Sequence, residues 1–201
     1  MTSQTQYWNR LIQPGIVALV GAGGKTTVLS KLVEYGRLQG QPIVVTTTTQ
    51  LYESQVAQYE PIYTKDINDV DEYCTKRIQQ GYCGAWFNGI TRTKVDAVDC
   101  ESIDGLSALH PNWQIVVEAD GAKEKWLKAP KHTEPVIPSQ TKTTIGVVNL
   151  QMLGASLDEN HVHNLELVQS IVHREEGAIV TPHMLAQIVL HKQGLFQYSK
   201  G

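Results

Sequence analysis

The stretch Ile16-Val17-Ala18-Leu19-Val20-Gly21-Ala22-Gly23-Gly24-Lys25-Thr26-Thr27 decides the fold of this chain. Its first five residues are an apolar run without polar alternation that stops at a glycine, which indicates a buried parallel strand. Apolar residues at helical spacing follow between positions 28 and 33, and Gly36 and Gly40 close that run. This pattern predicts a helix that packs its apolar face on the sheet. The order strand, glycine loop, helix is typical of an α/β protein.

A second strand is predicted over Pro42-Ile43-Val44-Val45, and it runs into the hydroxyls of Thr46-Thr47-Thr48-Thr49. Together with the first strand and helix it completes a βαβ unit, which favours parallel topology. Thr181-Pro182 resembles a helix N-cap followed by proline at the first helical position. Further strands are expected over residues 61–64, 84–87, 113–117 and 144–148, and further helices over 70–78, 165–173 and 181–191.

The glycine loop has the composition of a phosphate-binding turn. Glycines let backbone N–H groups converge on a phosphate, because they accept left-handed conformations and carry no Cβ. Lys25 would reach the β- and γ-phosphates of ATP or GTP, and the Thr26 hydroxyl would coordinate Mg²⁺. We therefore expect one three-layer P-loop NTPase domain over residues 1–201, with a mainly parallel central sheet flanked by helices. The expected nucleotide-binding residues are Gly21, Ala22, Gly23, Gly24, Lys25, Thr26 and Thr27.

The loop is shorter than the common pattern G-x-x-x-x-G-K-[ST]. That pattern places a glycine six residues before the lysine, where this chain has Leu19, and the first glycine here is Gly21. The compressed form G-x-x-G-K-T-T resembles the loop of the Mur-type ATP-dependent ligases more than that of kinases or Ras-like GTPases. The guanine-reading signature N-K-x-D does not occur in the sequence, which favours ATP over GTP without excluding GTP.

Two acids, Glu118 and Asp120, follow the predicted strand over residues 113–117. A phosphate loop needs a carboxylate at a neighbouring strand end, because Mg²⁺ keeps several waters and accepts few protein ligands. One acid could orient the metal, with Asp120 slightly favoured, while the other acts as base. The alternative is an ordinary acidic strand end facing solvent. The predicted catalytic set is Lys25, Glu118 and Asp120, with Thr26 and Asp120 as metal ligands.

The proline-punctuated segment beyond these acids is the expected substrate region, since stiffened loops often carry binding residues. A solvated charged loop would explain the same composition. Hydroxyls at the end of the second strand could also meet a phosphate or metal, although threonine is common in strands. The substrate candidates are Thr47, Thr48, Lys123, Lys128, His132 and Glu134.

Bulk composition argues against several partners. The 17 Lys+Arg and 20 Asp+Glu give a net charge of −3, so the chain lacks a basic field that would attract nucleic acid. No apolar run approaches the roughly 18 residues of a membrane span, and the polar start does not read as a secretory signal. We expect a cytoplasmic protein. His161 and His163 could suit a metal on an extended segment, but a hydrogen-bonding role is the preferred interpretation.

Five segments together resemble the YqeC family, described as selenium-dependent hydroxylase accessory proteins. They are Val20-Gly21-Ala22-Gly23-Gly24-Lys25-Thr26-Thr27, Val45-Thr46-Thr47-Thr48-Thr49, Val117-Glu118-Ala119-Asp120-Gly121-Ala122, Leu127-Lys128-Ala129-Pro130 and His132-Thr133-Glu134-Pro135-Val136-Ile137-Pro138. The resemblance spans nearly the whole chain. It implies a role in supplying or maturing the selenium-containing molybdenum cofactor of hydroxylases of the xanthine dehydrogenase type. Nucleotide hydrolysis is then expected, with a molybdenum hydroxylase or its cofactor as partner.

The chain departs from the family pattern in two places. The family tends to read G-L-D-x-L-G and later V-H-R, whereas this chain has Asn149-Leu150-Gln151-Met152-Leu153-Gly154 and Val162-His163-Asn164. An aspartate and an arginine are missing, so specificity or turnover would differ if these residues touch ligand in relatives. Besides an NTP-hydrolysing maturation enzyme, two alternatives stay open: a small-molecule kinase or ATP-dependent ligase, and a non-catalytic, nucleotide-gated cofactor chaperone.

Overall fold

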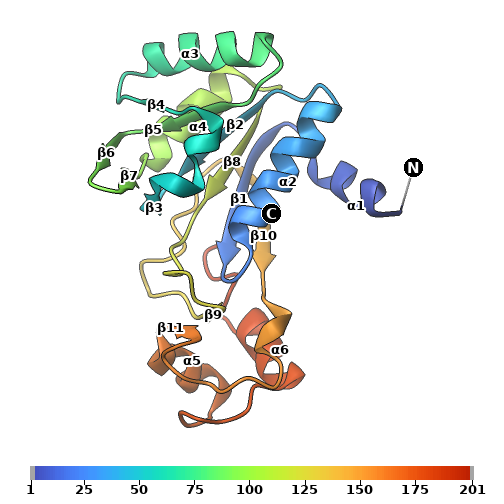
Figure 1. Cartoon of the computed structure of the whole chain (residues 1–201), viewed down its shortest axis with the longest axis vertical. Coiled ribbons are helices and arrows are strands. Elements are labelled where there is room, and N and C mark those ends of the chain that lie inside the picture. Colours follow the sequence, from blue (N-terminus) through green and yellow to red (C-terminus); the bar gives the residue numbers. More distant parts are fainter. Residues whose placement is uncertain (1–2, 200–201) are drawn as a thin grey trace.

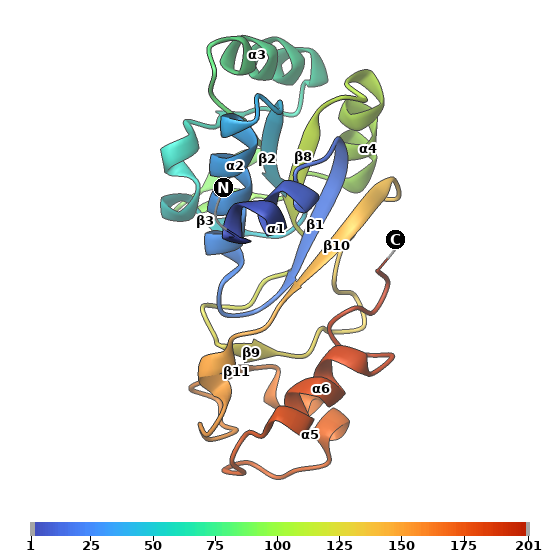
Figure 2. The same ribbon diagram turned by 90° about the vertical axis from the view of Figure 1, so that its right-hand side faces the viewer.

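A parallel sheet forms the centre of the molecule in a computed structural model that describes residues 3–199 (Figures 1 and 2). The sheet has six strands in the order β10-β1-β8-β2-β5-β4, and all neighbours run parallel. Its strands are β1 (Gly15–Gly21), β2 (Ile43–Thr47), β4 (Ile62–Tyr63), β5 (Gly84–Phe87), β8 (Gln114–Glu118) and β10 (Thr141–Val147).

Helices cover both faces of this sheet. Helices α1 (Ser3–Leu11) and α2 (Lys25–Leu38) pack on one face, where inward residues such as Val17 and Leu19 join the hydrophobic core. Helices α3 (Ile67–Gln79) and α4 (Cys100–Leu109) pack on the other, against the alternate residues of the same strands. Successive side chains of a strand point to opposite faces, so strands buried on both sides read as continuous apolar runs. The predicted three-layer α/β class with a parallel sheet is confirmed.

The order of the strands brings three strand ends together at one edge. Strand β8 lies between β1 and β2, and Glu118 at its end is in register with Leu19 on one side and Thr47 on the other. The two strands of the βαβ unit predicted from the sequence, β1 and β2, are therefore not neighbours, because β8 lies between them. Because the carboxyl ends of parallel strands share an edge, the glycine loop, the acids and the threonines meet there.

A second hydrophobic cluster lies beyond this carboxyl edge, below the sheet in Figures 1 and 2. It is built from two short parallel strands, β9 (Leu127–Lys128) and β11 (Val162–His163), with η3 (Leu150–Met152), α5 (Leu165–Val172) and α6 (Pro182–Leu190). We call residues 150–190 the C-terminal part. Thr181 caps α6 by accepting a hydrogen bond from the Met184 N–H, and Pro182 follows at the first helical position, as predicted.

Several elements carry no clear signal in the sequence. They are α1, α4 and a small antiparallel sheet of β3 (Leu51–Tyr52), β7 (Lys94–Asp96) and β6 (Gly89–Thr91), with the 3₁₀ turns η1 (Glu53–Gln55) and η2 (Ala57–Tyr59). Helix α3 begins three residues before the predicted range because Asp66 caps it through the Asn68 N–H. An N-cap side chain of this kind fixes where a helix starts.

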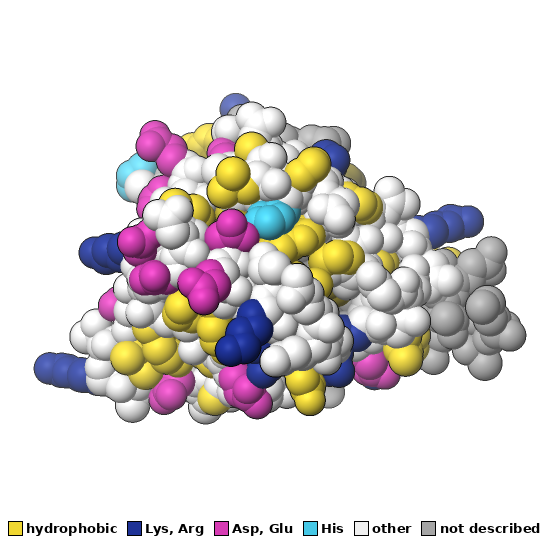
Figure 3. Space-filling view, turned by 90° about the horizontal axis from the view of Figure 1, so that it is seen from above, with side chains coloured by type: hydrophobic (Ala, Val, Ile, Leu, Met, Phe, Trp, Pro, Cys, Tyr) yellow, Lys and Arg dark blue, Asp and Glu magenta, His cyan; other side chains and the backbone are white. Residues whose placement is uncertain are grey.

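The end of the molecule seen from above mixes charges of both signs with hydrophobic side chains (Figure 3). In Figure 1 this is the end that carries α3, away from the carboxyl edge of the sheet. Over residues 3–199, the structure contains no helix that is both long and apolar enough to cross a membrane.

Candidate functional site

The glycine loop between β1 and α2 has a backbone conformation that favours glycine. Gly21 and Gly23 have φ values of 103° and 71°, which residues other than glycine rarely adopt. A Cβ on Gly21 would also come within 2.2 Å of the Val147 carbonyl oxygen, so this position requires glycine. Gly24 is the N-cap of α2 and offers no side-chain cap. The helix N-terminus therefore presents its first N–H groups, and the positive end of its dipole, to the loop.

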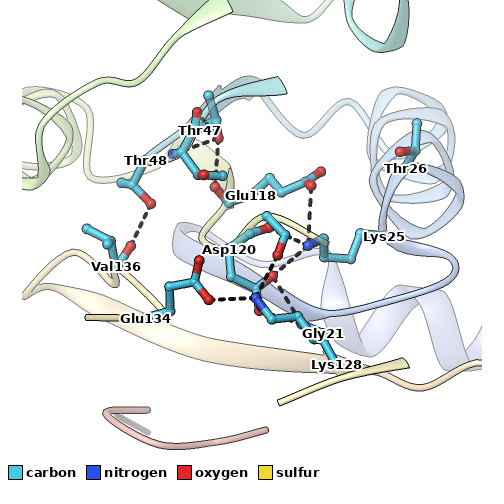
Figure 4. A network of polar contacts seen from close by, with 12 residues as sticks. Gly21, Lys25, Thr26, Thr47, Thr48, Glu118, Asp120, Lys128, Glu134 and Val136 are labelled. Atoms are coloured by element: carbon cyan, nitrogen blue, oxygen red, sulfur yellow. Dashed lines mark hydrogen bonds and ion pairs between the residues drawn. The ribbon is translucent and has the colours of Figure 1, made fainter. Parts of the chain in front are cut away.

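Lys25, the first residue of α2, points into a buried cluster of carboxylates (Figure 4). Its Nζ lies 2.5 Å from Asp120 Oδ1 and 3.4 Å from Glu118 Oε1, and it donates to the backbone carbonyl of Asp120. The side chain is only 5% exposed. A buried ammonium group needs such partners, because leaving water costs it several kcal/mol.

Asp120 is the centre of this cluster. Its carboxylate accepts the Gly21 N–H at 3.2 and 3.0 Å, pairs with Lys25, and lies 3.1 Å from Lys128 Nζ through Oδ2. Both oxygens are thus occupied by protein donors, and the side chain is 1% exposed. Asp120 ties the glycine loop, α2 and β9 to the end of β8.

Lys128 and Glu134 extend the cluster toward the proline-punctuated segment that follows β9 (Figure 4). Lys128 Nζ lies 2.9 Å from Glu134 Oε2 and donates to the Gly121 carbonyl at 2.7 Å. Burial alone would raise the pKa of Glu134, but the hydrogen bond and the charge of Lys128 outweigh burial and lower this pKa. Lys128 is therefore a buried cation shared between two carboxylates.

Glu118 differs electrostatically from Asp120. Burial raises the pKa of Glu118 above its ordinary value, and the nearby charge of Lys25 only partly opposes this rise. Its carboxylate also faces a cavity, which Asp120 does not. A carboxylate with a raised pKa accepts a proton more readily than an ordinary one, so Glu118, at the wall of a cavity, suits a general base.

This cavity, of about 600 Å³, opens between the glycine loop and the segment after β8. We call it the loop cavity. Residues of both charge signs line it, and the lysines outnumber the acids. They are Lys25, Lys94, Lys123, Lys125 and Lys131 against Glu118, Glu124 and Glu134. An excess of cations beside a helix N-terminus suits a phosphate-bearing ligand.

The predicted residues fall into three groups. Those at the wall of the loop cavity are Gly23, Gly24, Lys25, Thr26, Thr27, Glu118, Lys123 and Glu134. Those buried beside it are Gly21, Ala22, Asp120 and Lys128. The remaining three, Thr47, Thr48 and His132, lie apart from this cavity.

The threonines at the end of β2 make hydrogen bonds to backbone. Thr47 Oγ1 donates to the Glu118 carbonyl at 2.8 Å, and Thr48 Oγ1 donates to the Val136 carbonyl at 2.6 Å (Figure 4). These bonds hold the end of β2 to β8 and to the proline-punctuated segment that contains Val136. His132 lines a separate cavity of about 380 Å³ next to α5. None of these three candidates therefore lies on the wall of the loop cavity.

Sequence reasoning missed other residues of the wall, among them Tyr52, Gln55, Lys94, Trp126 and Asn149. Several come from the small antiparallel sheet and its turns, whose short segments have no hydrophobic period to detect. Gln55 Nε2 reaches the Thr26 hydroxyl at 3.3 Å.

The two histidines noted in the sequence have different surroundings. His161 Nδ1 lies 2.8 Å from Asp158, in agreement with a hydrogen-bonding role. His163 instead lines the loop cavity. Burial, and then the charges of Lys128 and Lys123, lower the pKa of His163.

The site offers oxygen ligands for Mg²⁺ at the cavity wall. The Thr26 hydroxyl and the Glu118 carboxylate both line the loop cavity, and Mg²⁺ prefers such hard oxygen donors. Within residues 3–199, no group of three or more His, Cys, Asp or Glu side chains is arranged to hold a metal. A nucleotide-bound Mg²⁺ needs only one or two protein ligands, so the Thr26 hydroxyl fits this ion. Both oxygens of Asp120, the other predicted ligand, face protein donors instead.

The fold and this site define a parallel α/β protein with a glycine loop and a buried lysine–carboxylate cluster at the carboxyl edge of its sheet. The chain belongs to the YqeC family: the family described as "YqeC protein" matches residues 17–166. It is 28% identical over 186 residues to "Uncharacterized protein YqeC" of Escherichia coli (strain K12), covering 92% of this chain and 71% of that relative. No solved structure gives a significant match.

Proposed function

We propose that this protein binds ATP or GTP with Mg²⁺ in the loop cavity and hydrolyses it. The observation that carries the proposal is the position of Lys25, at the start of α2 and at the wall of a lysine-rich cavity. The phosphates would lie against the loop N–H groups and Lys25, with the base toward one of two aromatic residues that line the cavity, Tyr52 and Trp126. Both aromatic side chains are partly exposed, at 39% and 37%.

Each residue has a proposed task in hydrolysis. Water attacks the terminal phosphorus, the bond to the bridging oxygen breaks, and the nucleoside diphosphate leaves with the electron pair. Lys25 balances the charge that develops on the phosphate oxygens. Glu118 orients the attacking water and accepts its proton. Mg²⁺, held by Thr26, would neutralise phosphate charge. Asp120 acts as a positioning residue, since it holds both Lys25 and Gly21.

The family resemblance supports a narrower proposal about the biological role. We propose that hydrolysis serves the maturation of the selenium-containing molybdenum cofactor of molybdenum hydroxylases, in the cytoplasm. The named relative is described as uncharacterized, so this role rests on the resemblance alone. The direct test is to delete the gene and measure the selenium content and activity of a selenium-dependent hydroxylase in the same cells.

A second candidate function is a small-molecule kinase or an ATP-dependent ligase. It is favoured by one observation: the loop cavity borders another cavity that could hold an acceptor. A transferase would release little phosphate until its acceptor is supplied.

The test of hydrolysis is phosphate release from Mg-ATP and Mg-GTP by the purified protein. We expect turnover that is lost in Lys25→Ala and in Glu118→Gln. Lys31→Ala, on the exposed surface of the same helix, is the matched control and should keep full activity. A protein that neither binds nor cleaves either nucleotide would overturn the proposal. Binding without hydrolysis would point to the transferase or the nucleotide-gated chaperone.

A further inference from the structure

A second cavity, of about 740 Å³, adjoins the loop cavity on the side of the C-terminal part. We call it the acceptor cavity. Its walls include Asn164 and, from α5, Gln169. It shares four residues with the loop cavity: Lys123, Lys125, Lys131 and His163. The two cavities therefore meet at these four side chains.

The charges of the acceptor cavity are separated. The three lysines stand on the shared wall, while the acids Glu159, Glu166 and Glu176 line the remainder. His163 belongs to the shared wall, and burial together with the neighbouring lysine charges lowers its pKa. A neutral imidazole can donate one hydrogen bond and accept another. The shared wall thus attracts an anionic group, and the rest of the cavity wall accepts hydrogen bonds or a positive charge.

Two lysines of the shared wall, Lys123 and Lys125, stand on a constrained segment. Lys123 and Glu124 both have left-handed backbones, with φ values of 47° and 59°, which non-glycine residues rarely adopt. Such strain persists only where surrounding contacts impose it, and it concentrates at functional sites. The next residue, Lys125, supplies such contacts: its N–H donates to the Ala122 carbonyl at 2.9 Å and its Nζ to the Asn160 carbonyl at 3.1 Å.

We propose that the acceptor cavity binds an acidic small molecule, with its phosphate or carboxylate group on the shared wall beside the terminal phosphate of the nucleotide. The inference rests on the proposed nucleotide site, and it names the class of second substrate. The remainder of the molecule extends along α5 and carries hydrogen-bond donors or a positive charge toward Glu166 and Glu176. This is the arrangement that the second candidate function, a small-molecule kinase or ATP-dependent ligase, would need.

The experiment uses protein saturated with Mg²⁺ and a non-hydrolysable ATP analogue, which fills the loop cavity. Inorganic phosphate and succinate are titrated separately by calorimetry, so that the two arms distinguish a phosphate from a carboxylate ligand. Gln169→Trp fills the acceptor cavity, and Gln169→Glu places a negative charge in it. The matched control is Ser170→Trp, the next residue of α5, which lines the separate cavity beside His132.

We expect at least one of the two anions to bind the analogue-loaded protein. Both Gln169 variants should weaken that binding by about tenfold or more, and Ser170→Trp should change it by less than about twofold. The affinity for the analogue should stay the same in all three. Absence of anion binding, or equal effects of Gln169→Trp and Ser170→Trp, would overturn the proposal.

Failure of the nucleotide site gives a different result. If the analogue does not bind at all, the proposed function fails, and the anions are titrated into Lys25→Ala. If the anions bind Lys25→Ala and Gln169→Trp weakens that binding, the acceptor cavity is supported independently of the nucleotide site. If the anions do not bind Lys25→Ala, the acceptor cavity is overturned as well.

Discussion

Lys25 and Asp120 form a buried ion pair, with Nζ 2.5 Å from Oδ1 and side chains that are 5% and 1% exposed. The pair joins the first residue of α2 to the chain just beyond β8, and the same carboxylate accepts the Gly21 N–H on the neighbouring strand. Asp120 therefore holds both Lys25, the residue expected to meet phosphate, and the glycine loop. Because these contacts join several elements of the fold, substitutions in the cluster should change the free energy of unfolding, which can be measured without an activity assay.

Asp120→Asn should strongly destabilise the protein. The amide can still accept the Gly21 N–H, but Lys25 loses its closest counter-charge and Lys128 keeps only Glu134. Removing one partner of a buried pair costs about 3–5 kcal/mol. We expect the free energy of unfolding, measured by equilibrium urea denaturation, to fall by the lower part of that range, because Glu118 stays near Lys25.

The control for this variant is Lys31→Ala, which removes an exposed pair with Glu34 on the outer surface of α2. Solvent screens such pairs, so the unfolding free energy should not change measurably. Equal losses in the two variants would contradict a special role of the buried cluster.

Glu118→Gln should stabilise the protein at neutral pH. The pKa of Glu118 is raised by burial from its ordinary value of 4.5, so the folded state favours the protonated form, which glutamine imitates. Ionising Glu118 therefore costs stability as the pH rises from 4.5 through the folded-state pKa. The unfolding free energy of the variant should exceed that of the wild type at pH 7, and this difference should shrink toward pH 4. A variant that is less stable at pH 7 would contradict it.

Glu134→Gln should show the opposite pH dependence. The pKa of Glu134 is lowered because the bond and charge of Lys128 outweigh burial. Its contribution to stability is complete above 4.5 and is lost as the pH falls through the folded-state pKa. The variant should be less stable than the wild type at pH 7, and the two urea transitions should converge at acid pH. A difference that persists unchanged at pH 3 would refute this prediction.

Gly21→Ala should disrupt the loop more than Gly40→Ala, although both glycines have positive φ. At Gly40 a Cβ meets nothing within 4 Å, so only backbone strain of about 1–2 kcal/mol is expected. At Gly21 the Cβ would also meet the Val147 carbonyl oxygen at 2.2 Å. Thermal unfolding of the two variants compares strain alone with strain plus collision. Similar melting temperatures would contradict the tight packing of the loop against β10.

Sequence reasoning recovered the fold where apolar periodicity was strong. The runs at β1, β2 and β8 are buried on both faces and read clearly as strands, whereas the shorter run at β5, also fully buried, gave a weaker signal. The shared family also emerged from sequence, because short motifs in a fixed order are specific even when their chemistry is unknown.

The wall of the loop cavity was less predictable, for a physical reason. Tyr52 lies on a two-residue strand and Lys94 on a three-residue strand, and the two strands pair in the small sheet. His163 comes from the C-terminal part. Residues of these kinds meet only through tertiary packing, which leaves no local period in the sequence. Thr47 and Thr48 were predicted as substrate candidates, but their hydroxyls donate to neighbouring backbone carbonyls. The sequence pattern of a hydroxyl at a strand end is the same for both roles.

The most direct measurement is calorimetric titration of the purified protein with Mg-ATP and Mg-GTP, beside Lys25→Ala that circular dichroism shows to be folded. We predict one nucleotide per chain for the wild type, with affinity reduced by about a hundredfold or more in Lys25→Ala, since the lysine contact to phosphate is charge-assisted. Absence of binding by the wild type, or equal affinity in the variant, would contradict a phosphate site at the glycine loop.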